Sequence, residues 1–383
     1  MALHFTKEEF EARRHRTCAA LAARGLDGLL MFRQESMYWL TGYDSFGFTF
    51  FQCLYLGVDD TIMLMTRAPD LRQARHTSLV TDIRIWEDRD GADPARQLRD
   101  HLESLGCQGK RLGVEWASHG LTAANGKLLD AALDGFCALD DASDLVARLR
   151  LVKSPAEMAF VRRAAELADD AWEAALGEAG PHADEGAILA AMHNAIFRGG
   201  GDYPANPFII GSGDDALLCR YKAGRRRLSA RDQLTLEWAG VYRQYHAAMM
   251  RTLPIGPVGD DHQAMFAACA EALMACREAL RPGGRVGDVF DAHARVLDEA
   301  GYREHRLNAC GYALGTMYAP SWMDWPMFYH GNPVELAPGM VFFVHIILMD
   351  STAGRAMTLG ETYEVRADGA RPLSRTPIEL VSR

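Results

Sequence analysis

The chain has 383 residues and a mass of 42.3 kDa, a size typical of two domains. Acidic residues outnumber basic ones by 51 to 41, and the resulting net charge of −10 argues against binding to nucleic acids or anionic membranes. An apolar content of 49% with 24% charged residues is typical of a folded globular protein. The longest apolar run, residues 340–349, is too short to cross a bilayer.

The eight cysteines are scattered, and no C-x-x-C pair occurs among them. The first thirty residues carry several charges and lack the continuous apolar segment of a secretory signal. These features predict reduced thiols in a cytoplasmic protein, without a disulfide framework or a zinc site.

The first half of the chain alternates helical and strand-like patterns, which is typical of an α/β layer. Strands are expected at residues 28–32, 48–58, 61–66 and 111–115. Helices are expected at residues 7–24, 93–105 and 123–134.

A capping box marks the start of a long helix at Ser154. Ser154 can accept a hydrogen bond from the amide three residues on, and Glu157 can reach back to the start of the helix. Pro155 stands where its missing N–H costs nothing. We therefore place a domain boundary just before this helix, with domains at residues 1–147 and 148–383.

The second half combines long helices with apolar strands, an α+β arrangement. Beyond the helix that begins at Ser154, helices are expected at residues 184–198, 261–280 and 286–300. Strands are expected at residues 233–237, 245–253, 340–348 and 361–365.

Six short segments follow one another along the chain as a set of motifs. They are Tyr-Trp-Leu-Thr-Gly at 38–42 and residues 148–157, 245–252, 280–283, 311–315 and 336–340. In this order they resemble the creatinase/aminopeptidase P superfamily over nearly the whole chain. The resemblance implies an α/β creatinase-type N-terminal domain followed by an α+β catalytic domain with the pita-bread fold.

The resemblance also implies where a metal site would lie. Peptidases of the superfamily hold two metal ions with two Asp, one His and two Glu. The matching positions in this chain are Glu237, Ala248, Tyr312, His345 and either Gly360 or Glu361. One clear carboxylate and one imidazole are a poor ligand set for two hard dications, so we expect neither a metal ion nor another cofactor.

Within the superfamily, the closer resemblance is to the metal-free ectoine hydrolases. It rests on residues 199–205, 237–246 and 39–44, with Tyr312 and the pair Gln52-Cys53. Two positions depart from the metal-free relatives. Arg220 stands where they have a His, and the creatinase Arg that helps clamp the substrate carboxylate would fall near Phe50 and is absent.

Glu237 is the first candidate catalytic residue. It ends an apolar strand-like run, where a carboxylate needs a partner to offset the cost of burial. It can anchor an amidinium, act as a general base or attack carbon as a nucleophile. The structural alternative is an ion pair with Arg251.

Two histidines and a tyrosine complete the candidate catalytic set. His246 shares a strand face with Ala248, and His345 interrupts an apolar run at a former ligand position. Either imidazole is expected to carry protons and to titrate between about pH 5 and 8. Tyr312 can donate its phenol proton to an oxyanion. For each of the three, a purely structural role remains the alternative.

Six further residues are candidates for substrate binding. Arg220 can hold a carboxylate or belong to a surface basic cluster with Lys222 and residues 225–227. Glu361 can hold a cation or stabilise Arg251. The remaining four are Asp202 and Tyr203, which follow three glycines, and Tyr43 and Phe48, which with Phe46 lie in an aromatic segment suited to stacking on a planar cation.

The sequence therefore predicts a metal-independent hydrolase that cleaves a C–N bond in a small nitrogen-rich compound: an ectoine-like cyclic amidine, a guanidine or a lactam. The resemblance implies a homodimer in which the N-terminal domain of one subunit covers the partner's site. Three alternatives remain: a lyase acting on a small zwitterion, an Xaa-Pro dipeptidase-like peptidase, and an inactive pita-bread module that binds a partner.

Overall fold

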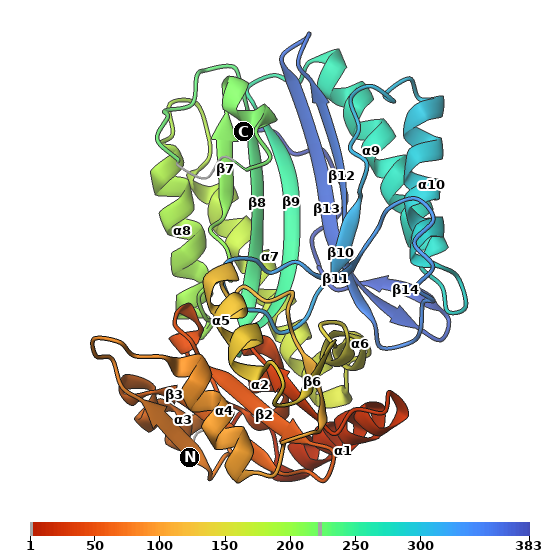
Figure 1. The fold of residues 1–383 in the computed structure, drawn as a ribbon. Coiled ribbons are helices and arrows are strands. Elements are labelled where there is room, and N and C mark those ends of the chain that lie inside the picture. Colours follow the sequence, from red (N-terminus) through yellow and green to blue (C-terminus); the bar gives the residue numbers. More distant parts are fainter. Residues whose placement is uncertain (1–2, 221–223) are drawn as a thin grey trace. The chain divides into compact units, whose positions relative to one another are not determined.

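The computed structural model describes residues 3–220 and 224–383 (Figure 1). The chain forms two compact units, Met1–Arg150 and Leu151–Arg383, which divide a few residues after the boundary placed from the sequence. The first unit is an α/β layer and the second an α+β layer, as predicted.

The first unit is built on a mixed six-stranded sheet. Its strand order is β4-β3-β2-β1-β5-β6. The strands are β1 (Gly28–Met31), β2 (Cys53–Gly57), β3 (Ile62–Arg67), β4 (Ile83–Trp86), β5 (Arg111–Val114) and β6 (Ala138–Asp141). The helices are α1 (Lys7–Ala23), α2 (Gln34–Thr41), α3 (Leu71–Thr77), α4 (Pro94–Ser104), α5 (Ala123–Leu133) and α6 (Leu145–Leu151).

The predicted strand at residues 48–58 is shorter than expected. Residues Gly47–Thr49 form a 3-10 turn, and the strand begins only at Cys53. The turn is held by Ser45, whose hydroxyl accepts from the Gly47 amide and donates to Asp70. A side chain at position 47 would collide with the Asp70 carboxylate, because an added Cβ would lie 2.5 Å from Oδ1.

This local structure corrects part of the predicted substrate-binding set. Tyr43 is fully buried in the first unit, and its hydroxyl donates to Gln52 at 3.2 Å. Phe48 is also buried, whereas Phe46 is 75% exposed. The prediction that Tyr43 or Phe48 offers a ring to a substrate is therefore wrong, and Phe46 alone of the three presents its ring to solvent.

The second unit is built on an eight-stranded sheet. Seven strands follow the order β11-β10-β12-β13-β9-β8-β7, and β14 pairs with β13. The strands are β7 (Ile209–Ser212), β8 (Asp232–Tyr242), β9 (Tyr245–Ile255), β10 (Gly311–Ala313), β11 (Asp324–Met327), β12 (Val341–Asp350), β13 (Arg355–Arg366) and β14 (Gly369–Pro372). The helices are α7 (Pro155–Glu178), α8 (Glu185–Arg198), α9 (Asp260–Ala279) and α10 (Val286–Glu299).

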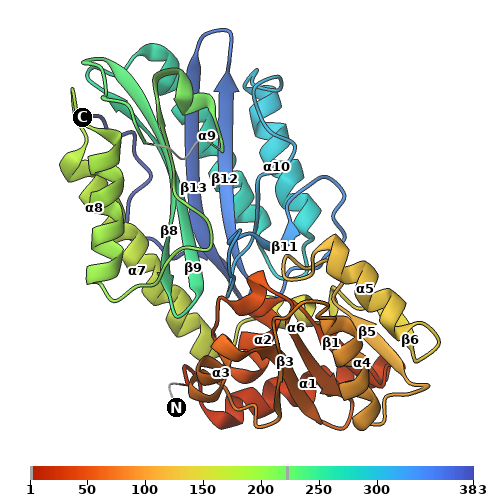
Figure 2. The same ribbon diagram turned by 60° about the vertical axis from the view of Figure 1, so that its left-hand side comes forward.

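The four helices of this unit form two pairs beside the sheet (Figures 1 and 2). Helix α7 packs on β8 and β9, and α9 packs on β12 and β13, while α8 and α10 pack on the outer sides of α7 and α9. Trp238 of β8 donates to the Ala168 carbonyl of α7 at 2.8 Å. Gly240 lets the helix approach closely, because an added Cβ would lie 1.9 Å from the Ala164 carbonyl oxygen. The predicted capping box of Ser154 and Glu157 begins α7.

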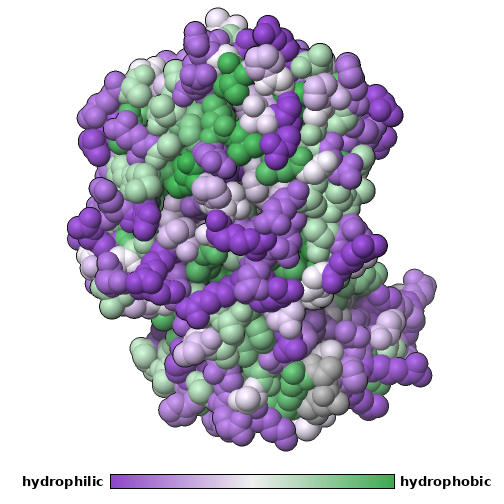
Figure 3. All heavy atoms as spheres, turned by 180° about the vertical axis from the view of Figure 1, so that it is seen from behind, coloured by the Kyte–Doolittle hydropathy of each residue, from purple (hydrophilic) through white to green (hydrophobic). Residues whose placement is uncertain are grey.

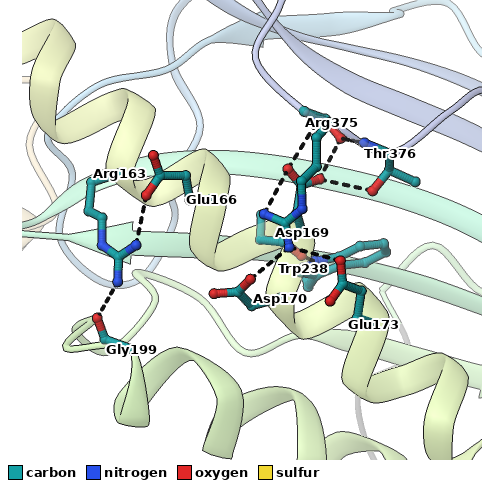
Figure 4. Close-up of polar contacts among 11 residues, drawn as sticks. Arg163, Glu166, Asp169, Asp170, Glu173, Gly199, Trp238, Arg375 and Thr376 are labelled. Atoms are coloured by element: carbon teal, nitrogen blue, oxygen red, sulfur yellow. Dashed lines mark hydrogen bonds and ion pairs between the residues drawn. The ribbon is translucent and has the colours of Figure 1, made fainter.

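A buried aspartate holds the C-terminal segment to α7 (Figure 4). Asp169 accepts hydrogen bonds from the Ser374 hydroxyl at 2.5 Å, the Arg375 amide at 2.9 Å and the Thr376 hydroxyl at 2.9 Å. The guanidinium of Arg375 pairs with Asp170 and Glu173 one turn along the helix. Asp169 is therefore the buried anchor, and the other two carboxylates are its exposed neighbours.

No helix among the described residues is long and apolar enough to cross a membrane. On the face drawn in Figure 3, hydrophilic and hydrophobic residues are interspersed.

The anchor predicts a specific loss of stability. Asp169→Ala removes three hydrogen bonds and should lower the free energy of unfolding by about 2–4 kcal/mol, at about 1 kcal/mol for each bond. Asp170→Ala removes only an exposed ion pair and should change it by less than about 1 kcal/mol. Urea unfolding of both variants measures the difference, and equal losses would contradict the assignment of Asp169 as the anchor.

Candidate active site

A row of directly paired residues crosses the second sheet. Glu237 of β8 lies opposite Met250 of β9, which lies opposite Gly360 of β13, which in turn lies opposite His345 of β12. Directly paired residues of antiparallel strands point to the same face. Because Trp238, the next residue on β8, points to α7, the row faces away from the helices. Glu237 and His345 therefore share the open face of the sheet.

Three more positions considered for the predicted site lie on this face. Ala248 and His246 alternate with the helix-facing residues of β9 and pair with Ala239 and Val241. Tyr312 of β10 lies opposite Phe343, two residues before His345 on β12. The face therefore gathers the residues that match the superfamily's ligand positions, and the fifth of them is Gly360.

Glu361 points to the opposite, helix-covered face. Its carboxylate pairs with Arg251 at 3.0 Å and accepts from the Tyr363 hydroxyl at 3.1 Å. The prediction that Glu361 binds the substrate is therefore wrong, and its alternative role of stabilising Arg251 is the one observed. For the same reason Arg251 cannot pair with Glu237, so the structural alternative for Glu237 is also wrong.

Glu237 is held by a short chain of hydrogen bonds. The Tyr312 hydroxyl donates to Glu237 Oε1 at 3.2 Å, and the indole N–H of Trp322 donates to the Tyr312 oxygen at 2.8 Å. Tyr312 was expected to donate to an oxyanion, but its proton is directed at Glu237. Trp322 was not among the predicted residues, since nothing in its sequence context marks it. Its place beside Tyr312 depends on the loop between β10 and β11.

Burial dominates the electrostatics of Glu237. Desolvation raises the pKa of its carboxyl from 4.5 to about 7, although the Tyr312 hydrogen bond and the charge of Arg220 act in the opposite direction. Glu237 therefore changes its charge near neutral pH. The structure offers it no ion pair among the described residues.

The pKa values of His246 and His345 differ from those expected from the sequence. Burial lowers the pKa of both His246 and His345 to about 4, so each ring is neutral at pH 7. The expectation that an imidazole titrates between pH 5 and 8 is therefore wrong, and Glu237 is the group that titrates there. His246 Nε2 accepts from the Ala205 amide at 3.0 Å, which ties the segment before β7 to β9. His345 Nδ1 has no partner among the described residues.

At Gly360, the position that matches the fifth metal ligand of the peptidases, the ring of Phe343 occupies the space that a side chain would need. A Cβ added at Gly360 would lie 2.7 Å from the Phe343 ring, so a larger residue there would displace that ring. Phe343 also packs against Tyr312 and His345, with ring centroids 5.6 and 5.4 Å away. Phe343 was not among the predicted residues, because only the strand register, which pairs it with Thr362, brings its ring beside Gly360.

The donor set does not fit a pair of metal ions. Glu237 offers one carboxylate and His345 one imidazole, while Ala248 and Gly360 offer no side-chain donor. Burial raises the pKa of Tyr312 well above its ordinary value, which keeps the phenol protonated. Within residues 3–220 and 224–383, no three His, Cys, Asp or Glu side chains are grouped as metal ligands. Two hard dications need several carboxylate oxygens.

Arg220 is exposed but is electrostatically linked to the site. Its charge lowers the pKa of both Glu237 and His345. Its suggested partner in a basic cluster, Lys222, lies outside the described residues. Farther along, Arg226 pairs with Asp232 at 2.6 Å, which gives that cluster a structural role of its own. Arg220 thus remains a candidate for substrate binding.

Asp202 and Tyr203 are placed differently from each other. The Asp202 carboxylate accepts from the Arg243 amide in the turn between β8 and β9, where Arg243 has a φ of 49°. Tyr203 is 79% exposed and packs edge-on against Phe197. Asp202 therefore closes a turn, and its role in substrate binding stays a prediction. Tyr203 presents its ring to solvent.

Two protein-family models match this chain. The model for metallopeptidase family M24 matches residues 159–367, and that for the creatinase/prolidase N-terminal domain matches residues 13–152. The chain is 27% identical to an ectoine hydrolase of Halomonas elongata, over 89% of this chain and 90% of that protein. It is 28% identical to the uncharacterized hydrolase/peptidase y4tM of Sinorhizobium fredii, over 99% and 98%.

A solved prolidase from Thermococcus sibiricus has the same fold. It superposes with a TM-score of 0.88 at 18% identity, covering 98% of this chain and 99% of that one.

The raised pKa of Glu237 predicts how stability depends on pH. Between about pH 4.5 and 7 the native state keeps a proton that the unfolded chain releases, so burial of Glu237 lowers stability as the pH rises. Glu237→Gln removes this titration. The variant should gain stability over the wild type across that interval, by about 3 kcal/mol at pH 8. Urea unfolding at pH 5 and 8 measures the gain, and a pH-independent difference would contradict it.

Proposed function

The chain belongs to metallopeptidase family M24, and within this family of hydrolases we propose that it cleaves a C–N bond in a small nitrogen-rich compound without a metal ion. The proposed substrates are ectoine-like cyclic amidines, guanidines and lactams. The observation that carries the proposal is Glu237, a single buried carboxylate that titrates near neutral pH and stands among former ligand positions that lack their donors. The ectoine hydrolase relative supports the substrate class.

Glu237 can act as both base and acid in such a reaction. In its ionised form it takes a proton from water as the water oxygen bonds to the substrate carbon. It then returns that proton to the leaving nitrogen as the C–N bond breaks, so atoms and charge balance. A pKa near the working pH suits both steps.

Other residues of the open face can bind the substrate. The neutral His345 ring has an unpartnered Nδ1 and can form a hydrogen bond with a substrate nitrogen or oxygen. The guanidinium of Arg220 can hold a carboxylate with two hydrogen bonds. His246 holds the 205 segment through Nε2, and its Nδ1, like that of His345, has no hydrogen-bond partner among the described residues.

Loss of the carboxylate should abolish most of the activity. Glu237→Gln should lower turnover by at least about 100-fold, the usual range for general acid–base groups being about 10²–10⁴. The matched control is Glu361→Gln, which removes a buried carboxylate from the helix-covered face and should leave turnover within about threefold. Purified protein is assayed against ectoine, hydroxyectoine, creatine, other guanidines and lactams. Near-wild-type turnover of the Glu237 variant would exclude the mechanism.

Metal independence is tested separately. After exhaustive chelation, the protein should keep its activity, because four of the five matched positions differ from the ligands of the peptidases. Ala248 and Gly360 replace carboxylates, Tyr312 replaces an imidazole, and His345 carries an imidazole in place of a carboxylate. Elemental analysis beside the assay measures the metal content. Stoichiometric metal whose removal abolishes activity and whose return restores it would contradict the proposal. Cleavage of Xaa-Pro dipeptides by the metal-loaded protein would favour a peptidase instead.

A further inference from the structure

We propose that Trp322 is a positioning residue that fixes the direction of the hydrogen bond between Tyr312 and Glu237. Its indole N–H holds the Tyr312 oxygen, so the phenol proton is donated to Glu237 Oε1. Oε2 is then the carboxylate oxygen left for proton transfer to a substrate. Only this last consequence rests on the proposed function.

The direction of the hydrogen bond between Tyr312 and Glu237 follows from which groups can donate a proton and which can accept one. An indole N–H can only donate, so the Tyr312 oxygen must accept at 2.8 Å. The phenol has one proton, and its second short contact is with Glu237 Oε1 at 3.2 Å. Because the indole N–H points its proton at the Tyr312 oxygen, the phenol's own proton is free to point at Glu237 Oε1. Ionised Glu237 can only accept, so the phenol donates to it, and the indole N–H strengthens this donation by occupying one of the two acceptor sites of the phenol oxygen.

Trp322 is itself held in place by a neighbouring segment. Its backbone N–H donates to Asn206 Oδ1 at 3.1 Å, and the adjacent Ala205 amide donates to His246 Nε2. The Trp322 and His246 rings lie 6.4 Å apart. Trp322 and Tyr312 are almost completely buried, so water does not compete for these hydrogen bonds. The segment before β7 thus supports the indole, and the indole orients the phenol.

The surroundings of Glu237 allow the indole to be tested alone. The charged and titratable groups that act on Glu237 or share its surroundings are Tyr312, Arg220, Cys219 and His345. Replacing Trp322 leaves all four side chains in the protein, and Tyr312 loses the hydrogen bond from the indole. A change in the behaviour of Glu237 in Trp322→Phe therefore reports the lost N–H or the altered packing of the ring, and a double-variant cycle separates these two causes.

The experiment compares Trp322→Phe, Tyr312→Phe and the double variant without any substrate. Infrared spectra of each protein, minus those of the same protein carrying Glu237→Gln, isolate the Glu237 carboxyl and give its titration midpoint. Trp322→Phe should raise the midpoint by about half to one pH unit, since the ionised form loses part of a hydrogen bond. In the Tyr312→Phe background, the same replacement should cause no further shift.

Two results would overturn the proposal. An unchanged midpoint in Trp322→Phe would show that the indole N–H does not orient Tyr312. An equal shift with and without the Tyr312 hydroxyl would show that Trp322 acts on Glu237 by packing.

A second variant covers the case in which Trp322→Phe does not fold. Asn206→Ala removes the acceptor of the Trp322 backbone N–H, together with the hydrogen bond from the Asn206 amide to the Pro207 carbonyl. It should raise the midpoint in the same direction by a smaller amount, again only when Tyr312 is present. Absence of that shift would also count against the proposal. Since no turnover is measured, failure of the proposed function leaves this result unaffected.

Discussion

The electrostatics of the open face depend on one buried carboxylate, Glu237, which forms no ion pair within residues 3–220 and 224–383. Glu237 is removed from water by the sheet and its neighbours, and the Tyr312 hydroxyl offsets part of the cost of that burial. A hydrogen bond stabilises the ionised form less than an ion pair would, so the pKa stays near 7 instead of falling. The structure thus keeps a group at position 237 that can gain and lose a proton at neutral pH.

Strand alternation separates this carboxylate from a second buried one nearby. Glu361 lies one residue from Gly360, but it faces the helices and is neutralised by Arg251. Among the described residues, the same sheet therefore carries an ion pair on one face and, on the other, a titrating carboxylate without one. The donor set of the open face does not fit two metal ions, since Ala248 lacks a side-chain donor and the Phe343 ring occupies the space beside Gly360.

The sequence by itself determined the domain types, the long elements and the candidate face. The helices that begin at Pro155 and Asp260 and the strands around Glu237 and His345 are long and strongly patterned, so local signals suffice. Short strands such as β10 and β11 were not predicted, because three or four residues carry too little periodicity in the sequence. Matching motifs also placed Glu237, Ala248, Tyr312 and His345 together, and the strand register confirms that they share a face.

Only the tertiary structure decided what each side chain does. Whether Glu237 or Glu361 pairs with Arg251 depends on which face each strand residue occupies, and motif matching could not choose between Gly360 and Glu361. The low pKa of both histidines and the raised pKa of Glu237 arise from burial by residues distant in sequence. Trp322 and Phe343 entered the site for the same reason: hydrogen bonding and packing join segments whose separation along the chain conceals their proximity in the fold.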